Sequence, residues 1–206
     1  MKILLIILGV LASAFVAIQI FALNSQRNIE TYPYAVIKKY KTFETRAYEA
    51  TLFTSVKLSE SDFKKASSQG FSILAGYIFG GNDLNEKIAM TSPVSVSLED
   101  STTMMFMVPK KLHKDILPRP NQPEVEFKKE PAKTVAALQF SGWANNKKIK
   151  KYKQQLQTAL ANNGISHTNR FCFFGYNAPY EVFNRKNEII VELYQNTINQ
   201  KHETTL

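Results

Sequence analysis

A run of 21 residues without a charged side chain, from Ile3 to Leu23, constrains this chain more than any other feature of its sequence. Only Ser13 and Gln19 within it are clearly polar. A helix rises about 1.5 Å per residue, so a run of this length can cross the roughly 30 Å hydrocarbon core of a bilayer. The run lacks the polar face of an amphipathic core helix. We therefore expect residues 1–27 to form an N-terminal membrane segment.

Two interpretations of this segment are open. Lys2, the apolar stretch that follows it and the small residues Ala12-Ser13-Ala14 resemble a secretory signal with its cleavage site. The apolar run continues nine residues past that site, which favours an uncleaved single-pass anchor. A signal-like N-terminus usually sends the following chain across the membrane, so we expect a periplasmic or extracytoplasmic soluble part. That part is divided into a domain at residues 28–196 and a polar C-terminal tail at residues 197–206.

Composition and charge narrow the class of protein. With 44% hydrophobic and 12% aromatic residues the chain can bury a core, and its single cysteine excludes an intrachain disulfide framework. The net charge is +9, but the basic residues are not interleaved with aromatic residues in a recognisable nucleic-acid motif, so we expect no nucleic-acid partner. One predicted helix carries five lysines, either as a solvated face or as a surface for phospholipid headgroups: Lys147, Lys148, Lys150, Lys151 and Lys153.

Periodicity predicts an α+β fold. Alternating apolar and polar residues indicate half-buried strands of the antiparallel type at residues 48–57, 94–98, 104–108, 124–128, 133–140, 171–176 and 188–193. Helical spacing indicates helices at residues 60–78 and 145–162. The first follows a capping-box sequence at Ser59–Asp62, and the second begins at Asn145 and ends at Gly164.

The order of these elements repeats after about 85 residues. Each helix is preceded by at least one strand and followed by two, and we interpret the chain as two β-β-α-β-β halves. Such halves most simply form one antiparallel sheet, strongly curved or barrel-like, with two helices packed against it. A concave surface between them is the natural place for a ligand.

The sequence contains no familiar catalytic motif. A Gly-rich phosphate loop, HExxH and G-x-S-x-G are all absent. Cys172 lies in an apolar strand, which would raise the thiol pKa and leave it inert. The three histidines are expected to be solvated, and we assign no metal site and no catalytic residue. A general base at Glu44 or Glu181 stays open as an alternative.

Several motifs, in the right order, are similar to those of the SOUL haem-binding family. They span most of the soluble part, from about Tyr34 to Leu193, and comprise Glu44-Thr45-Arg46-Ala47-Tyr48, Tyr77-Ile78-Phe79-Gly80-Gly81-Asn82, Lys87-Ile88-Ala89-Met90-Thr91-Ser92-Pro93-Val94, Tyr176-Asn177-Ala178-Pro179-Tyr180 and Arg185-Lys186-Asn187-Glu188. The resemblance implies a distorted β-barrel flanked by two helices. It also implies binding of haem or another porphyrin on an apolar surface, without catalysis. Pro179-Tyr180 departs from the family's frequent Pro-Pro-Trp.

A porphyrin has a flat apolar face and two propionates, so its site needs apolar walls and one or two cations at the rim. The residues that we expect to supply them are Tyr77, Phe79, Asn82, Lys87, Met90, Tyr180, Phe183 and Arg185. For Met90, Phe79 and Phe183 a place in the core is the competing interpretation. Iron can be held by His, Met, Cys or Tyr, and the sequence fixes no axial ligand.

The sequence therefore predicts a monomeric, membrane-anchored tetrapyrrole-binding protein that holds its ligand mainly by apolar contact, as a carrier, buffer or sensor. Two other functions stay open. One is a small-molecule hydrolase of the GyrI-like type, because that fold is similar to the SOUL fold. The other is a tethered interaction protein whose basic helix faces lipid headgroups.

Overall fold

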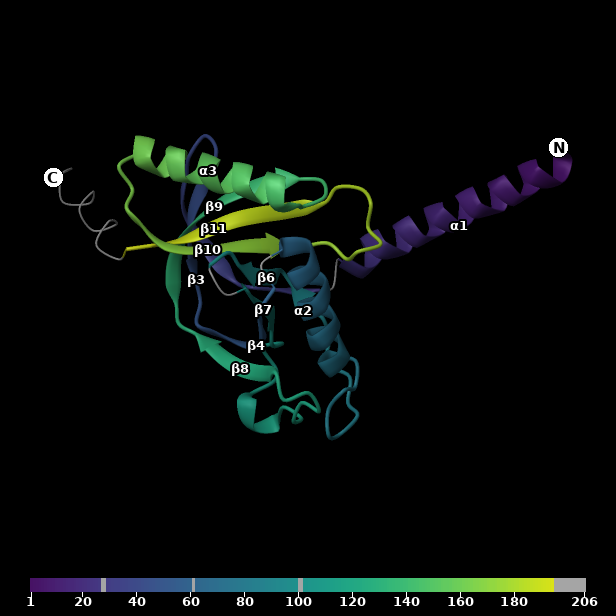
Figure 1. Cartoon of the computed structure of the whole chain (residues 1–206), viewed down its shortest axis with the longest axis horizontal. Helices are drawn as coiled ribbons and strands as arrows, with labels where there is room; N and C mark the ends of the chain where they lie inside the picture. The colour runs from purple at the N-terminus through teal and green to yellow at the C-terminus, as the bar shows by residue number, and fades with distance from the viewer. Residues whose placement is uncertain (27–28, 61, 100–101, 195–206) are drawn as a thin grey trace.

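The computed structural model describes residues 1–26, 29–60, 62–99 and 102–194 (Figure 1). Nine strands form one mixed-length sheet in which every pair of neighbours is antiparallel, in the order β2-β3-β9-β11-β10-β6-β7-β4-β8. Its strands are β2 (Tyr34–Lys39), β3 (Glu44–Tyr48), β4 (Thr51–Leu58), β6 (Val94–Ser97), β7 (Thr102–Met107), β8 (Val125–Glu130), β9 (Lys133–Ser141), β10 (His167–Gly175) and β11 (Lys186–Leu193). A separate parallel pair joins β1 (Glu30–Thr31) to β5 (Thr91–Ser92).

The sheet is curled rather than fully closed, with β2 and β8 at its two edges. Its antiparallel character, its curvature and its two packed helices confirm the predicted α+β class. The two predicted halves also exist, one built on β3, β4, β6 and β7 and the other on β8, β9, β10 and β11. The predicted tail at residues 197–206 lies outside the described residues.

The two halves exchange their first strands. The predicted strand at 48–57 is interrupted after Tyr48, and β3 and β4 do not pair with each other. Instead β3 pairs with β9 of the other half, while β4 pairs with β8. Tyr48 faces Lys133 and Thr51 faces Glu130, so the two pairings keep one register across the break. The chain therefore crosses between the halves at two connections, β3 to β4 and β8 to β9, which lie side by side.

Two helices pack on one face of the curled sheet. Helix α2 (Phe63–Ile78) contacts β4 and β7, and helix α3 (Asn146–Asn162) lies along β9, β10 and β11 (Figure 1). Asp62 caps α2 by accepting a hydrogen bond from the Lys65 N–H, and Asn145 caps α3 by accepting one from the Lys148 N–H. Both helices are where the periodicity predicts them. A short 3₁₀ helix, η1 (Lys114–Ile116), lies between β7 and β8.

Two apolar clusters hold the domain together. The larger lies under α2 and α3 and includes Leu74, Met104, Leu156 and Phe171. The smaller lies on the opposite, inner face of the sheet and is aromatic; it contains Tyr32, Tyr48, Phe53, Met105, Met107, Val135, Ala137, Phe174 and Ile190. All buried members of both clusters lie after residue 28, so the domain has its complete core without the first helix.

That first helix, α1 (Lys2–Gln26), projects away from the domain (Figure 1). Within it, Lys2–Ile20 is long and apolar enough to cross a membrane, and none of this span is buried. The helical form of the N-terminal segment is confirmed.

Candidate functional site

Two neighbouring cavities lie between α2 and the connection from β10 to β11, with volumes of about 420 and 550 Å³. We call the two together the α2 groove. They share five lining residues: Phe71, Val94, Gly175, Asn177 and Pro179. Each volume falls within the range of about 300–1,000 Å³ that is usual for small-molecule sites. The concave surface that the sequence predicts is therefore present, at the side of one helix.

The smaller cavity has apolar walls and a basic rim. Phe63, Met104, Trp143 and Phe173 are among its lining residues, and Lys64 is exposed beside them. The backbone brings these side chains together because α2 packs directly on β7. At Gly70 an added Cβ would lie 2.9 Å from the Leu58 side chain and 3.1 Å from the Met104 Cβ. This close approach fixes the helix against the sheet and so sets the width of the groove.

Arg185 is held firmly beside this cavity. Its Nη1 donates hydrogen bonds to the carbonyls of Glu181 and Ala178, at 2.6 and 2.9 Å, and its guanidinium lies 4.0 Å from the centre of the Trp143 ring. Burial lowers the pKa of Arg185 from its usual range, while the nearby Glu181 carboxylate opposes that effect.

Two buried donors of the cavity wall have no hydrogen-bond partner among the described residues. They are the Arg185 Nε–H and the Ser67 hydroxyl, and both residues line the smaller cavity. A buried donor without a partner costs about 1–3 kcal/mol. The positive charge of Arg185 beside apolar walls suits a ligand with an acidic group, and a carboxylate that reached the guanidinium could accept from its Nε–H.

The larger cavity is lined by the connection between β10 and β11 and by the residues around Phe79. Phe79 and Tyr180 are exposed at its mouth, and Met90 is half-buried in its wall. Glu181 also lines it, but its carboxylate accepts hydrogen bonds from the Asn177 side chain and the Ala178 N–H, at 2.7 and 3.0 Å. That carboxylate holds its own loop in shape.

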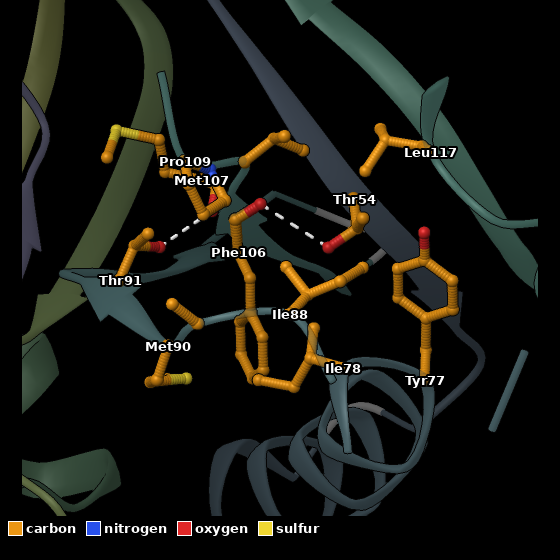
Figure 2. Close-up of a pocket in the computed structure, with 12 residues that line it drawn as sticks. Thr54, Tyr77, Ile78, Ile88, Met90, Thr91, Phe106, Met107, Pro109 and Leu117 are labelled. Atoms are coloured by element: carbon orange, nitrogen blue, oxygen red, sulfur yellow. Dashed lines mark hydrogen bonds between the residues drawn. The ribbon is translucent and has the colours of Figure 1, made fainter. Parts of the chain in front are cut away.

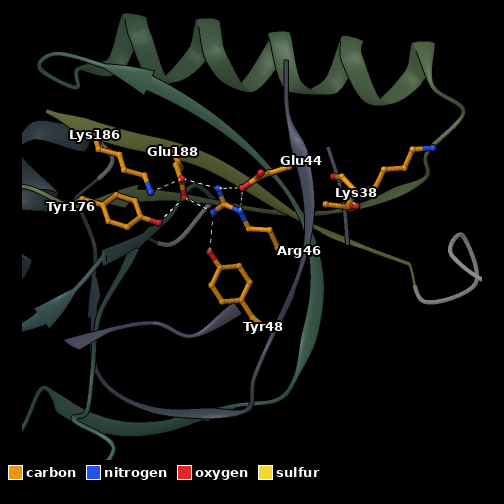
Figure 3. Close-up of polar contacts among 8 residues, drawn as sticks. Lys38, Glu44, Arg46, Tyr48, Tyr176, Lys186 and Glu188 are labelled. Carbon is orange, nitrogen blue, oxygen red and sulfur yellow. Dashed lines mark hydrogen bonds and ion pairs between the residues drawn. The ribbon is translucent and has the colours of Figure 1, made fainter. Parts of the chain in front are cut away.

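A buried ion-pair network fixes the inner end of this connection (Figure 3). Arg46 on β3 donates to both carboxylate oxygens of Glu188 on β11, at 2.8 and 2.9 Å, and also lies 2.6 Å from Glu44. The Tyr176 hydroxyl, in the wall of the larger cavity, donates to Glu188 at 2.6 Å. Although burial opposes ionisation, the hydrogen bonds and charge of Arg46 hold the pKa of Glu188 below its usual range, and burial together with Glu188 raises that of Tyr176.

The eight residues that we predict for the site are not all placed in the groove. Phe79, Met90 and Tyr180 line the larger cavity and Arg185 lines the smaller one. Tyr77 lies in the interior, where its hydroxyl donates to the Pro118 carbonyl, and with Met90 it borders a nearly filled space of about 10 Å³ (Figure 2). A role for Tyr77 in ligand binding stays a prediction.

Asn82, Lys87 and Phe183 have other surroundings. Asn82 is buried and braces its loop, donating to the carbonyls of Tyr77 and Glu86 and accepting from the Glu86 N–H. Lys87 is exposed in the same loop. Phe183 is exposed and packs edge-on against Phe15 of α1, with ring centroids 6.4 Å apart. The competing interpretation of Phe79 and Phe183 as core residues is wrong, because both side chains are more than half exposed.

Sequence reasoning missed several wall residues, namely Ser67, Phe71, Trp143 and Tyr176. Helical spacing places Phe71 on the buried stripe of α2, so no local signal separates a wall position from a core position. Trp143 lies in a loop far from α2 in sequence. Tyr176 belongs to a quoted motif, and the Arg46 and Glu188 that fix it stand in two further motifs.

Other reactive groups are placed outside the groove. Burial raises the pKa of Cys172 to about 11, which agrees with the prediction of an inert thiol. His167 lies at the start of β10 and stacks edge-on with Phe171. The described residues contain no group of three or more His, Cys, Asp or Glu side chains that could hold a metal ion.

Fold and site together define a class: α+β domains with a curled antiparallel sheet made of two related halves and a small-molecule groove beside one helix. Comparison with known proteins gives the family. Residues 29–192 match the family model described as SOUL heme-binding protein. The chain therefore belongs to the SOUL haem-binding family, as its motifs indicate, and this membership supports haem binding.

Curated relatives agree with this assignment. The chain is similar to Heme-binding protein 1 of Sus scrofa, with 25% identity over 174 residues that cover 79% of this chain and 92% of the relative. It is also similar to Heme-binding protein 2 of Homo sapiens, with 29% identity over 157 residues that cover 72% and 76%.

Solved structures share the fold at much lower identity. The EcmrR C-terminal domain has a TM-score of 0.59 at 13% identity and covers 74% of this chain and 96% of its own. A hydrolase from Listeria innocua has a TM-score of 0.50 at 9% identity, covering 77% and 94%. At such identities the likeness shows the architecture alone.

Proposed function

We propose that this chain is a membrane-anchored haem-binding protein that holds a porphyrin in the α2 groove and acts as a carrier or buffer. The observation that carries the proposal is the pairing of apolar walls with unsatisfied donors in one place. The rings of Phe71, Trp143 and Phe173 offer flat apolar contact. The Arg185 Nε–H, with the charge of the guanidinium, is suited to a propionate.

Apolar contact dominates the proposed complex. Met90 and Tyr180 are wall residues of the types that can ligate haem iron. Tyr176 is less suited, because its hydroxyl donates to Glu188 and its pKa is raised, so a phenolate is disfavoured there. None of the histidines is among the residues that line the described cavities. We therefore expect exchangeable binding in which the ring and propionates contribute more than the iron.

Titration of residues 28–206 with hemin and with iron-free protoporphyrin tests the proposal, since the core is complete without α1. We expect saturable binding of both with similar affinity. Removing a charge-assisted hydrogen bond costs about 1.5–3 kcal/mol, so Arg185→Met should weaken both by roughly 10- to 100-fold. Arg170→Met is the matched control, because Arg170 pairs with Glu192 outside the groove. Absence of saturable binding, or an equal loss of affinity in Arg185→Met and Arg170→Met, would refute the proposed porphyrin site.

A hydrolase is the second candidate, since a fold neighbour bears that name. A general base needs a carboxylate that is free to accept a proton near neutral pH. The Glu44 carboxylate accepts a hydrogen bond from Arg46 at 2.6 Å, and the Glu181 carboxylate is bonded within its loop. Family membership also suggests binding rather than catalysis. Ester hydrolysis that is lost in Glu181→Gln would favour the enzyme.

The basic helix offers less support for a third candidate, a tethered interaction protein. Lys147, Lys150 and Lys151 are exposed on α3. Lys148 instead donates to the Ser141 carbonyl, and the Lys153 Nζ lies 4.5 Å from the centre of the Phe171 ring. The five lysines therefore do not form one free face. Salt-sensitive liposome binding that falls when the three exposed lysines are replaced by Gln would favour this candidate.

A further inference from the structure

Gln19 of α1 clamps the connection between β10 and β11. Its side-chain Nε2 donates to the Tyr180 carbonyl at 3.0 Å, and its Oε1 accepts from the Val182 N–H at 3.2 Å. One turn earlier on the helix, Phe15 packs against Phe183. These contacts join the apolar helix to the loop that lines the larger cavity.

The contacts of Gln19 supply hydrogen-bond partners for a polar side chain that α1 would otherwise place in the membrane without them. A polar side chain in hydrocarbon must find partners, since water is not available there. Of the two clearly polar residues of the run, Ser13 donates to the Gly9 carbonyl within the helix itself. The Gln19 amide instead uses both its donor and its acceptor on the backbone of residues 180–182.

The loop that meets Gln19 has the surface of a membrane contact. Tyr180, Val182 and Phe183 are exposed by 50, 42 and 59%, and Phe79 at the mouth of the same cavity by 61%. Soluble proteins rarely expose several large apolar side chains in one patch, and aromatic side chains favour the boundary between lipid headgroups and acyl chains. Their position beside a membrane-spanning helix identifies the bilayer as the occupant of this surface.

The depth of the contact is reasonable. Phe15 lies five residues before Ile20, where the candidate span ends, and eight residues before Leu23, where the apolar run ends. At about 1.5 Å per residue these separations place Phe15 roughly 7–12 Å from the end of the apolar segment. Apolar side chains of interfacial segments reach about 5–10 Å into the boundary.

We propose that the tip of the β10–β11 connection is seated in the bilayer interface by Gln19, so that the larger cavity opens onto the lipid and its ligand exchanges with the bilayer rather than with water. The identity of that ligand as a flat, apolar macrocycle rests on the proposed function. The seating of the loop does not depend on it.

A fluorescent probe on the full chain tests the seating without haem. Phe183→Cys in a Cys172→Ser background is labelled with an environment-sensitive fluorophore and reconstituted in phosphatidylcholine vesicles with brominated acyl chains. We expect blue-shifted emission and quenching by bromine. Ile116→Cys in the same background is the control, because Ile116 is equally exposed but lies in η1, next to β8. Emission from position 183 as water-like and unquenched as that from position 116 would overturn the proposal.

A second pair of variants tests the clamp. Gln19→Leu keeps α1 apolar and removes both hydrogen bonds to the loop, so we expect bromine quenching at position 183 to fall while the chain stays in the vesicles. Ser13→Leu should leave the quenching unchanged. Equal quenching in both variants would refute the role of Gln19. Hemin binding together with an unquenched probe would refute the seating of the loop and leave the proposed function intact. A quenched probe without hemin binding would refute the proposed function and leave the seating intact.

Discussion

Replacing Arg46 by Met should destabilise the domain more than any exposed charge substitution. Glu188 has 0% exposure and depends on two hydrogen bonds from Arg46, so the variant leaves a buried carboxylate without its main partner. Breaking a buried pair in this way costs about 3–5 kcal/mol. Tyr176 and Lys186, 2.6 and 3.2 Å from the carboxylate, keep part of the stabilisation, which places the loss at about 3 kcal/mol, the lower end of that range.

Equilibrium urea unfolding of residues 28–206 measures this loss. Arg170→Met is the control, since Arg170 is 64% exposed in its pair with Glu192 and surface pairs contribute about 0–1 kcal/mol. The double variant Arg46→Met with Glu188→Gln should recover part of the stability, because it removes the unpaired charge. Equal losses for Arg46→Met and Arg170→Met would refute the reasoning.

The loss of stability in Arg46→Met should depend on pH, and the pKa of Glu188 gives the direction of that dependence. In the parent chain the pKa of Glu188 is lowered, so its contribution to stability is present above the ordinary pKa of about 4.5 and is lost as the pH falls below it. Without Arg46 the buried carboxylate has a raised pKa, and its cost grows as the pH rises. The difference in stability between parent and variant should therefore be larger at pH 7 than at pH 4.5. A difference that does not change with pH would contradict this account.

The remaining predictions concern two glycines, one helix cap and the cysteine. Gly76→Ala should raise the melting temperature, because helix propensity gains about 1 kcal/mol and only the Gln122 side chain lies within 4 Å of the new Cβ. Gly81→Ala should lower the melting temperature, because its Cβ would lie 2.7 Å from a backbone oxygen. Asn145→Ala should cost about 1 kcal/mol in urea unfolding through loss of the α3 cap, and no loss would contradict the capping role. The thiol of Cys172 should react slowly with alkylating reagents at pH 8 and faster toward pH 11; rapid reaction at pH 8 would contradict its raised pKa.

Local patterns predicted the elements well. The helices at 60–78 and 145–162 and most strands lie within a few residues of their observed bounds, because alternation and helical spacing follow directly from one buried face. The strand predicted at 48–57 was wrong at its start. Tyr48 pairs with Lys133 of β9, whereas Thr51 pairs with Glu130 of β8. The strand partner therefore changes at the break between them, and alternation of apolar and polar residues does not encode that change.

Some residues of the α2 groove, but not all, were among those predicted from the sequence, for a related reason. Phe79, Tyr180 and Arg185 stand in motifs, and the structure brings them to the α2 groove. The Arg46–Glu188 pair spans 142 positions of sequence, and charged residues on a strand are normally interpreted as its solvated face. The clamp by Gln19 was likewise invisible, because a polar residue in an apolar run does not reveal its partner.

The exchange of β3 and β8 between the halves suggests how such a chain can arise. Two identical half-length chains that each lend their first strand to the other would form a domain-swapped dimer. Joining the end of one copy to the start of the other gives the pairing seen here, with β3 beside β9 and β8 beside β4. After such a fusion neither copy is complete without the other's strand. The duplication is thereby locked into one cooperative unit, and the two copies are free to diverge, one keeping its helix beside a groove and the other covering its helix with lysines.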